Sequence, residues 1–190
     1  MPNRKDKSGG DRRSGLSPTG VHPPEEGGIA GRFDRILEEL VAACKSHYAD
    51  RLVSLAVYGS VGRGTPRPDS DIDLLLVAED LPDGRVKRAD EFRVIERSLE
   101  RAEDASPDPG PPVFLSPVIK TIREVRCGSP LFLDMTEDAR ILFDRDGFLE
   151  DFLSGFRERL VRLGSKRIWV GSAWYWDLKP DYVPGEVFEL

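Results

Sequence analysis

The chain has 190 residues, 39% of them hydrophobic, and a formal net charge of -6 at pH 7. This length is typical of one domain with a sizeable core, and the acidic balance argues against broad nucleic-acid binding without excluding a local basic groove. No apolar run is long enough to cross a membrane, no signal peptide is evident and the two cysteines have no metal-like spacing, so we expect a cytoplasmic protein with reduced thiols.

The first segment, residues 1–28, is rich in Gly, Pro, Ser and charged side chains and has hardly any large apolar ones. Such a segment buries too little surface to offset the entropy lost on ordering, so we expect a disordered tail. Ordered structure should begin near Gly31, where apolar side chains start to recur every three or four residues, as on one face of a helix. We expect one domain over residues 29–165 and an extension over residues 166–190.

Two apolar runs, Leu52–Tyr58 and Ile72–Val77, are predicted to be strands. The second run is continuously apolar, which is typical of a strand covered on both faces. Between the two runs, Pro66 and Pro68 disfavour regular helix or a central strand. A turn at Leu81–Gly84 then leads into a helix with one apolar face.

The remaining elements follow a proline-rich loop at Ser106–Pro112. A third strand is expected at Val113–Ile119, where Pro117 implies an edge position or a bulge. Three further elements are a helix from Ser129 to about Met135, a strand from Arg140 to Phe143, and a long helix from Phe148 to Leu163. Together these elements predict an α/β (α+β) fold: a small mixed β-sheet with helices packed mainly on one face and a helical, aromatic-rich C-terminal extension.

Two aspartates, Asp71 and Asp73, begin the second predicted strand. Because side chains of an extended chain alternate between faces, both carboxylates should point the same way. Carboxylates this close repel each other unless a divalent cation or a shared proton relieves the repulsion. Hard oxygen ligands of this kind suit Mg²⁺, whose coordination shell is completed by phosphates and water. We therefore predict a Mg²⁺ site at this pair, at which Mn²⁺ could substitute.

A glycine-serine turn follows the first predicted strand. Gly59 would let the backbone approach a ligand closely. Ser60 could cap the short segment after it and leave backbone amides open to an anion. A phosphate-binding turn would then precede the acidic pair, whereas the plainer interpretation is a hairpin followed by two solvated aspartates.

Residues 58–77 read Y-G-S-V-G-R-G-T-P-R-P-D-S-D-I-D-L-L-L-V. This stretch resembles the polymerase β-like nucleotidyltransferase superfamily, in particular its minimal and kanamycin nucleotidyltransferase branches. The resemblance implies Mg²⁺-dependent transfer of a nucleoside monophosphate from a nucleoside triphosphate such as ATP to an acceptor hydroxyl, with release of pyrophosphate. It also implies that Gly59 and Ser60 hold the terminal phosphates, that Arg63 lies beside them, and that Asp71 and Asp73 are catalytic metal ligands.

Members of this superfamily normally carry a third carboxylate on the third strand, where it acts as the base for the attacking hydroxyl. Here residues 113–121 read V-F-L-S-P-V-I-K-T and contain no Asp or Glu. Asp108, Glu124 and Asp134 are nearby substitutes, and the sequence does not choose among them. A displaced base, a water-mediated route and a site that binds nucleotide but turns over poorly all remain open.

The sequence also does not identify the acceptor of the nucleotidyl group. Minimal nucleotidyltransferases often act beside a helical toxin partner, as antitoxins that bind it or attach a nucleotide to it, so the resemblance allows a protein acceptor or a toxin partner. A catalytically weak nucleotide-binding module is a further hypothesis. Residues 166–185 hold all three tryptophans beside basic side chains. We expect this aromatic segment to pack on the domain, with stacking against a nucleobase as the alternative.

Overall fold

The structure is a computed structural model, and it describes residues 28–106, 110–171 and 173–190. The predicted disordered tail, Gly28 apart, lies outside the described residues. So does Asp108, one of the three candidates for a third carboxylate.

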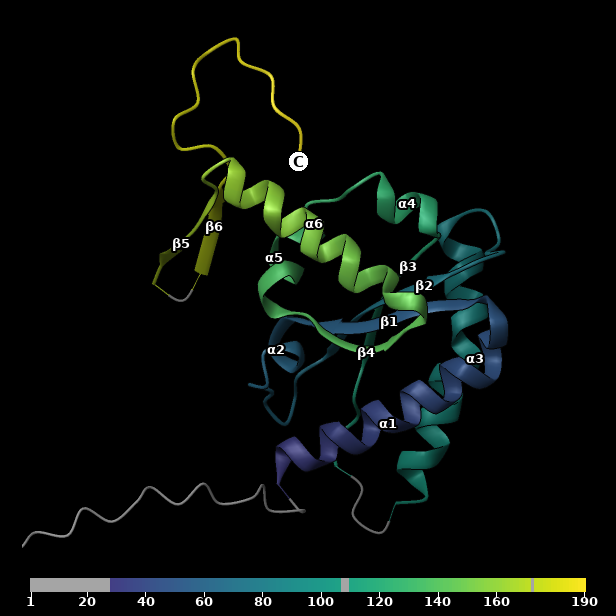
Figure 1. Ribbon diagram of the computed structural model, residues 1–190. Helices are drawn as coiled ribbons and strands as arrows, with labels where there is room; N and C mark the ends of the chain where they lie inside the picture. The colour runs from purple at the N-terminus through teal and green to yellow at the C-terminus, as the bar shows by residue number, and fades with distance from the viewer. Residues whose placement is uncertain (1–27, 107–109, 172) are drawn as a thin grey trace, which may run out of the picture.

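A four-stranded mixed sheet forms the centre of the fold, with strand order β3-β2-β1-β4 (Figure 1). The central strands β1 (Leu52–Tyr58) and β2 (Ile72–Ala78) are antiparallel. At the edges, β3 (Leu115–Lys120) runs parallel to β2, and β4 (Arg140–Asp144) runs antiparallel to β1. The predicted mixed sheet is confirmed, and so is the edge position of Pro117, which has no N–H to donate to a second neighbour.

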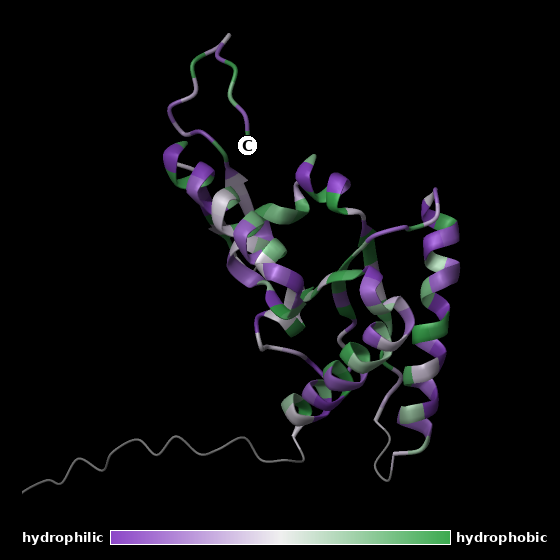
Figure 2. Cartoon of the chain, turned by 45° about the vertical axis from the view of Figure 1, so that its right-hand side comes forward, coloured by the Kyte–Doolittle hydropathy of each residue, from purple (hydrophilic) through white to green (hydrophobic). Residues whose placement is uncertain are grey.

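Helices cover both faces of this sheet. The long helices α1 (Ile29–Tyr48) and α3 (Arg85–Asp104) pack on one face, while three others pack on the opposite face: α4 (Ile122–Arg126), α5 (Leu131–Asp138) and α6 (Phe148–Arg162). In Figure 2 the long helices carry both hydrophobic (green) and hydrophilic (purple) residues, as expected for helices with one buried side. None of the helices in the described ranges is long and apolar enough to cross a membrane.

The expectation that the helices pack mainly on one face is therefore wrong, and β2 shows the reason. Its side chains alternate between two separate cores: Leu74 and Leu76 contact the core with α1 and α3, whereas Leu75 and Val77 contact the core with α5 and α6. All four side chains are fully buried. A continuously apolar strand needs cover on both sides, as the run itself predicted.

The register of the sheet places the motif residues together at one end. β1 leads directly into a short helix, α2 (Gly59–Gly62), and the antiparallel partner β2 begins beside that point, with Tyr58 opposite Asp73. On the other side of β2, the parallel register sets Ser116 of β3 beside Asp73. Two 3₁₀ helices, η1 (Ala49–Arg51) and η2 (Arg145–Gly147), connect elements at the other end of β1.

The C-terminal segment forms a separate antiparallel hairpin of β5 (Lys166–Val170) and β6 (Ala173–Asp177). The prediction of a helical extension is wrong for these residues, because alternating aromatic and β-branched side chains favour strands and Gly171, at φ 63°, supplies the turn. The hairpin lies beside α5 in Figure 1. Trp176 and the following Leu178 pack against the core that contains α5 and α6.

Candidate active site

Gly59 brings the backbone at the end of β1 against the Asp73 carboxylate. Its φ is +67°, in the left-handed region that L-residues with a side chain rarely adopt, and a Cβ placed there would lie 2.5 Å from Asp73 Oδ2. No side chain therefore fits between this turn and the carboxylate. The structure thus joins the predicted phosphate-binding turn and the predicted acidic pair in one place.

Ser60 does not cap α2, contrary to the expectation from the sequence. It lies inside the short helix, and its hydroxyl is 3.3 Å from the Ser70 hydroxyl, at the far end of the loop that connects the two central strands. Ser70 Oγ also accepts a hydrogen bond of 2.9 Å from the Arg67 backbone. These contacts close the loop at its base and hold α2 next to Asp71.

Asp71 and Asp73 form an electrostatically coupled pair. Asp71 is exposed just before β2, and Asp73 is half-buried within it. Burial and then the negative charge of Asp71 raise the pKa of Asp73 above its ordinary value, while the positive charge of Arg63 opposes this shift. The pKa of Tyr58 is also raised, by burial and by the charge of Asp73. Two carboxylates in this arrangement are a donor set that fits a hard divalent cation.

The strand β3 contributes no carboxylate. The two candidates for a third carboxylate that lie within the described residues, Glu124 and Asp134, accept hydrogen bonds from other groups. Glu124 caps α4, accepting from the Thr121 backbone at 2.8 Å and from Arg88 Nη1 at 2.7 Å. Asp134 accepts the indole N–H groups of Trp174 and Trp176 at 2.7 and 2.9 Å. Within the described ranges, no three acidic, histidine or cysteine side chains form a group that could hold a metal ion. Among the described residues, the acidic pair Asp71 and Asp73 therefore has no third carboxylate beside it.

Replacing Glu124 by Gln is expected to lower stability without lowering activity. The hydrogen bond from Arg88, followed by that from the Thr121 backbone, lowers the pKa of Glu124 from 4.5 to about 2. A depressed carboxylate pKa stabilises the fold above the unfolded-state pKa, and that contribution is lost as the pH falls from 4.5 towards 2. Thermal unfolding should thus show a destabilised Glu124→Gln protein at pH 7 and a shrinking difference in acid. Glu158→Gln, at an exposed position of α6, is the control. Nucleotidyl transfer reduced by about 100-fold in Glu124→Gln would instead make Glu124 the third carboxylate.

Arg63 lies close enough to Asp73 for its positive charge to oppose the rise in the pKa of that carboxyl, and it also contacts two residues that sequence reasoning did not connect with it. Its Nη1 donates to Asp138 Oδ2 at 3.1 Å, and its guanidinium lies 5.3 Å from the ring centre of Trp174. Asp138 is buried and in turn accepts two hydrogen bonds from Arg167 of β5. The only sequence signal for this cluster was the mixture of basic and aromatic side chains in residues 166–185.

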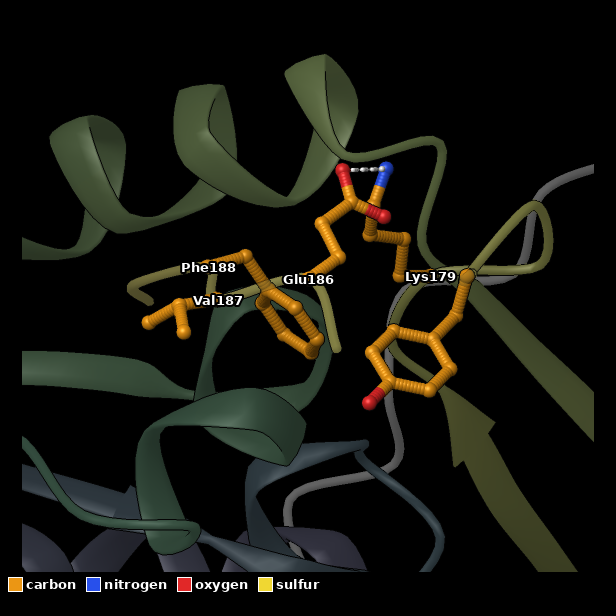
Figure 3. A pocket seen from close by; sticks show the side chains of 5 residues that line it. Lys179, Glu186, Val187 and Phe188 are labelled. Carbon is orange, nitrogen blue, oxygen red and sulfur yellow. Dashed lines mark ion pairs between the residues drawn. The ribbon is translucent and has the colours of Figure 1, made fainter. Parts of the chain in front are cut away.

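A separate cavity of about 450 Å³ lies in the C-terminal tail, away from these residues. It is lined by Lys179, Tyr182, Glu186, Val187 and Phe188 (Figure 3). Lys179 forms ion pairs of 3.2 Å with both Asp181 and Glu186. Its charge is therefore balanced within the tail, and the cavity shares no residue with the acidic pair or the glycine-serine turn.

Comparison with known proteins identifies the class. The nucleotidyltransferase domain family matches residues 37–142, more than half of the chain, so this protein belongs to that family and is a nucleotidyltransferase. A Methanocaldococcus jannaschii protein, named as a candidate protein adenylyltransferase (MJ1305), is 31% identical over 148 residues, which cover 77% of this chain and 94% of that protein. The family match ends within β4 and leaves the hairpin β5–β6 outside it.

Similar solved structures are more distant. Spectinomycin adenyltransferase AAD(9) from Enterococcus faecialis, with ATP and spectinomycin, has a TM-score of 0.46 and 10% identity over 62% of this chain and 58% of that one. The tri-AMPylated Shewanella oneidensis HEPN toxin in complex with its MNT antitoxin has a TM-score of 0.42 and 13% identity over 69% of this chain and 92% of that one. Membership of the family rests on the sequence matches, not on these similarities.

Proposed function

We propose that this nucleotidyltransferase transfers a nucleoside monophosphate from a nucleoside triphosphate to a protein hydroxyl, with Mg²⁺ or Mn²⁺ as cofactor and pyrophosphate as the second product. The observation that carries the proposal is the close approach of the Gly59 backbone to the Asp73 carboxylate, which leaves no room for a side chain between them. The turn that would bind the phosphates and the acidic pair that would hold the metal therefore lie side by side. The similarity to a relative named as a protein adenylyltransferase supports a protein as the acceptor and ATP as the donor.

Each residue of the site has a role in this proposal. Asp71 and Asp73 would hold the metal, which when bound neutralises charge on the attacking and leaving oxygens. Ser60 and Arg63 would donate hydrogen bonds to the terminal phosphates and orient the triphosphate. The acceptor hydroxyl would give up its proton to solvent water, and its oxygen would form a bond to the α-phosphorus as the bond to the bridging oxygen breaks. The departing pyrophosphate would take the electron pair of the broken bond.

The test is incubation of the purified protein with Mg²⁺ and each of the four α-labelled ribonucleoside triphosphates, in the presence of proteins from its host. We expect label on one or a few protein bands, together with release of pyrophosphate. Label on RNA ends or small molecules alone would contradict a protein acceptor while leaving the transfer reaction intact. Tight nucleotide binding without any label would contradict transfer and favour a catalytically weak nucleotide-binding module.

The identity of a labelled protein would decide the more specific hypothesis of a toxin partner. A small helical protein that is labelled on tyrosine and co-purifies with this chain would support it. Label on unrelated, abundant proteins that do not bind this chain would contradict it.

A further inference from the structure

Two arginines share one buried carboxylate beside the candidate active site. Asp138, at the end of α5, is only 8% exposed and accepts hydrogen bonds of 3.0 and 3.1 Å from Nη1 and Nη2 of Arg167. The same carboxylate accepts the 3.1 Å hydrogen bond from Arg63 Nη1. Because the pair with Arg167 is bidentate, it fixes the orientation of the carboxylate that Arg63 meets.

The same two arginines also share one aromatic ring. The guanidinium of Arg167 lies 4.3 Å from the ring centre of Trp174, and that of Arg63 lies 5.3 Å from it. Arg167 also lies 5.1 Å from the ring centre of Trp169. Contacts of this kind stabilise a cation in a fixed position. The hairpin β5–β6 therefore supplies both the ring and the second cation that surround Arg63.

The charges of this cluster leave an excess that suits an anion. Two guanidinium groups face one carboxylate, so one positive charge is not balanced within the cluster. Arg63 is the outer member, with 32% of its side chain exposed, against 12% for Arg167. Among the described residues, the hydrogen bond of Arg63 to a side chain uses Nη1 alone, so other N–H groups of its guanidinium can reach a phosphate.

Backbone packing joins the cluster to the phosphate-binding turn. A Cβ at Gly62 would lie 2.4 Å from the Asp138 carbonyl oxygen and 2.9 Å from that of Val57. α2 therefore rests directly on the backbone of Asp138. The position of Asp138 is thus fixed relative to the glycine-serine turn. Arg167, through its hydrogen bonds to Asp138, connects the hairpin to both.

We propose that Asp138 and Arg167 are positioning residues for Arg63, which makes the hairpin β5–β6 a part of the nucleoside triphosphate site. This inference rests on the proposed function, in which Arg63 binds the terminal phosphates. Arg167 acts by holding Asp138, and Asp138 acts by holding Arg63 with its free N–H groups towards the phosphates. The hairpin lies outside residues 37–142, which the family match covers, so the proposed support comes from beyond the matched residues.

The experiment is a double-mutant cycle between Arg167 and Arg63. The Kd for each nucleoside triphosphate with Mg²⁺ is measured by calorimetry, and KM and kcat by label transfer, for Arg167→Ala, Arg63→Ala and the double variant. We expect Arg167→Ala to raise Kd and KM by about 10-fold with a smaller effect on kcat, the size of one lost charge-assisted contact. In the Arg63→Ala background, Arg167→Ala should change Kd by less than about 2-fold, because the effect passes through Arg63.

Two further variants separate positioning from folding. Trp176→Phe removes one of the two hydrogen bonds from the hairpin to Asp134 and replaces no residue that contacts Arg63, so it should lower the unfolding temperature without changing Kd. Arg167→Lys keeps the charge but not the bidentate geometry, should fold if Arg167→Ala does not, and should also raise Kd.

The outcomes distinguish this inference from the proposed function. An unchanged Kd in both Arg167 variants, or an equal loss in both Arg63 backgrounds, would overturn the positioning role while leaving the function intact. A wild-type protein that binds none of the four nucleotides would overturn both.

Discussion

Replacing Asp73 by Asn should abolish nucleotidyl transfer and leave the protein folded. Asn keeps the shape of the side chain but removes the charge that would hold the divalent cation, so we expect a loss of about 100-fold or more in kcat. Asp69→Asn is the matched control, because Asp69 is an exposed aspartate in the same loop. Label transfer under saturating triphosphate measures the effect. Equal transfer by Asp73→Asn and wild-type protein would remove the acidic pair from the mechanism.

The same substitution has an expected signature in stability. The pKa of Asp73 is raised by burial and by Asp71. A raised carboxylate pKa contributes stability below the unfolded-state pKa, and this contribution is lost as the pH rises through the folded-state pKa. At neutral pH and without Mg²⁺, the Asn variant should therefore unfold at the same temperature as wild type or higher. Mg²⁺ should raise the unfolding temperature of the wild type and of Asp69→Asn, but not that of Asp73→Asn. An equal rise in all three would place the cation elsewhere.

The parts of this site that the sequence could predict are local in the chain. β1 and β2 are neighbouring apolar runs joined by one loop, and their antiparallel pairing brings Gly59 and Asp73 together. Strand positions follow from the same apolar runs, and the edge position of β3 follows from Pro117. The short motif of residues 58–77 was therefore sufficient to predict the turn, the acidic pair and the family.

The parts that the sequence could not predict depend on distant contacts. Arg63 and Asp138 are 75 positions apart, and no local pattern indicates which carboxylate an arginine will meet. Asp134 is a candidate third carboxylate by sequence, but in the structure it accepts a hydrogen bond from Trp174, which is 40 positions away. Glu124 is similar, since its partner Arg88 is 36 positions away. Charged residues of one type cannot be told apart in sequence. The packing of α5 beside the hairpin decides the roles of Asp134 and Asp138, and the contact between α3 and α4 decides that of Glu124.

Gly59→Ala should cost far more activity than Gly64→Ala, although both glycines have nearly the same positive φ. Their φ angles are +67° and +71°, so an alanine at each position meets the same left-handed strain, about 1 kcal/mol. At Gly64 nothing lies within 4 Å of the added methyl group, whereas at Gly59 the methyl group would lie 2.5 Å from Asp73 Oδ2. The difference between the two variants therefore measures the contact between turn and carboxylate.

We expect Gly64→Ala to unfold in urea with a free energy lower by about 1 kcal/mol and to keep most of its transfer activity. Gly59→Ala should lose more stability and at least about 100-fold in transfer, because the displaced carboxylate no longer meets the phosphates and the cation in one place. The double variant Gly59→Ala, Asp73→Ala should recover stability to the level expected from backbone strain alone, because the clashing carboxylate is absent, while activity stays lost. If Gly59→Ala and Gly64→Ala instead lose equal stability and equal activity, the turn does not touch the carboxylate, and the geometry on which the proposed function rests is wrong.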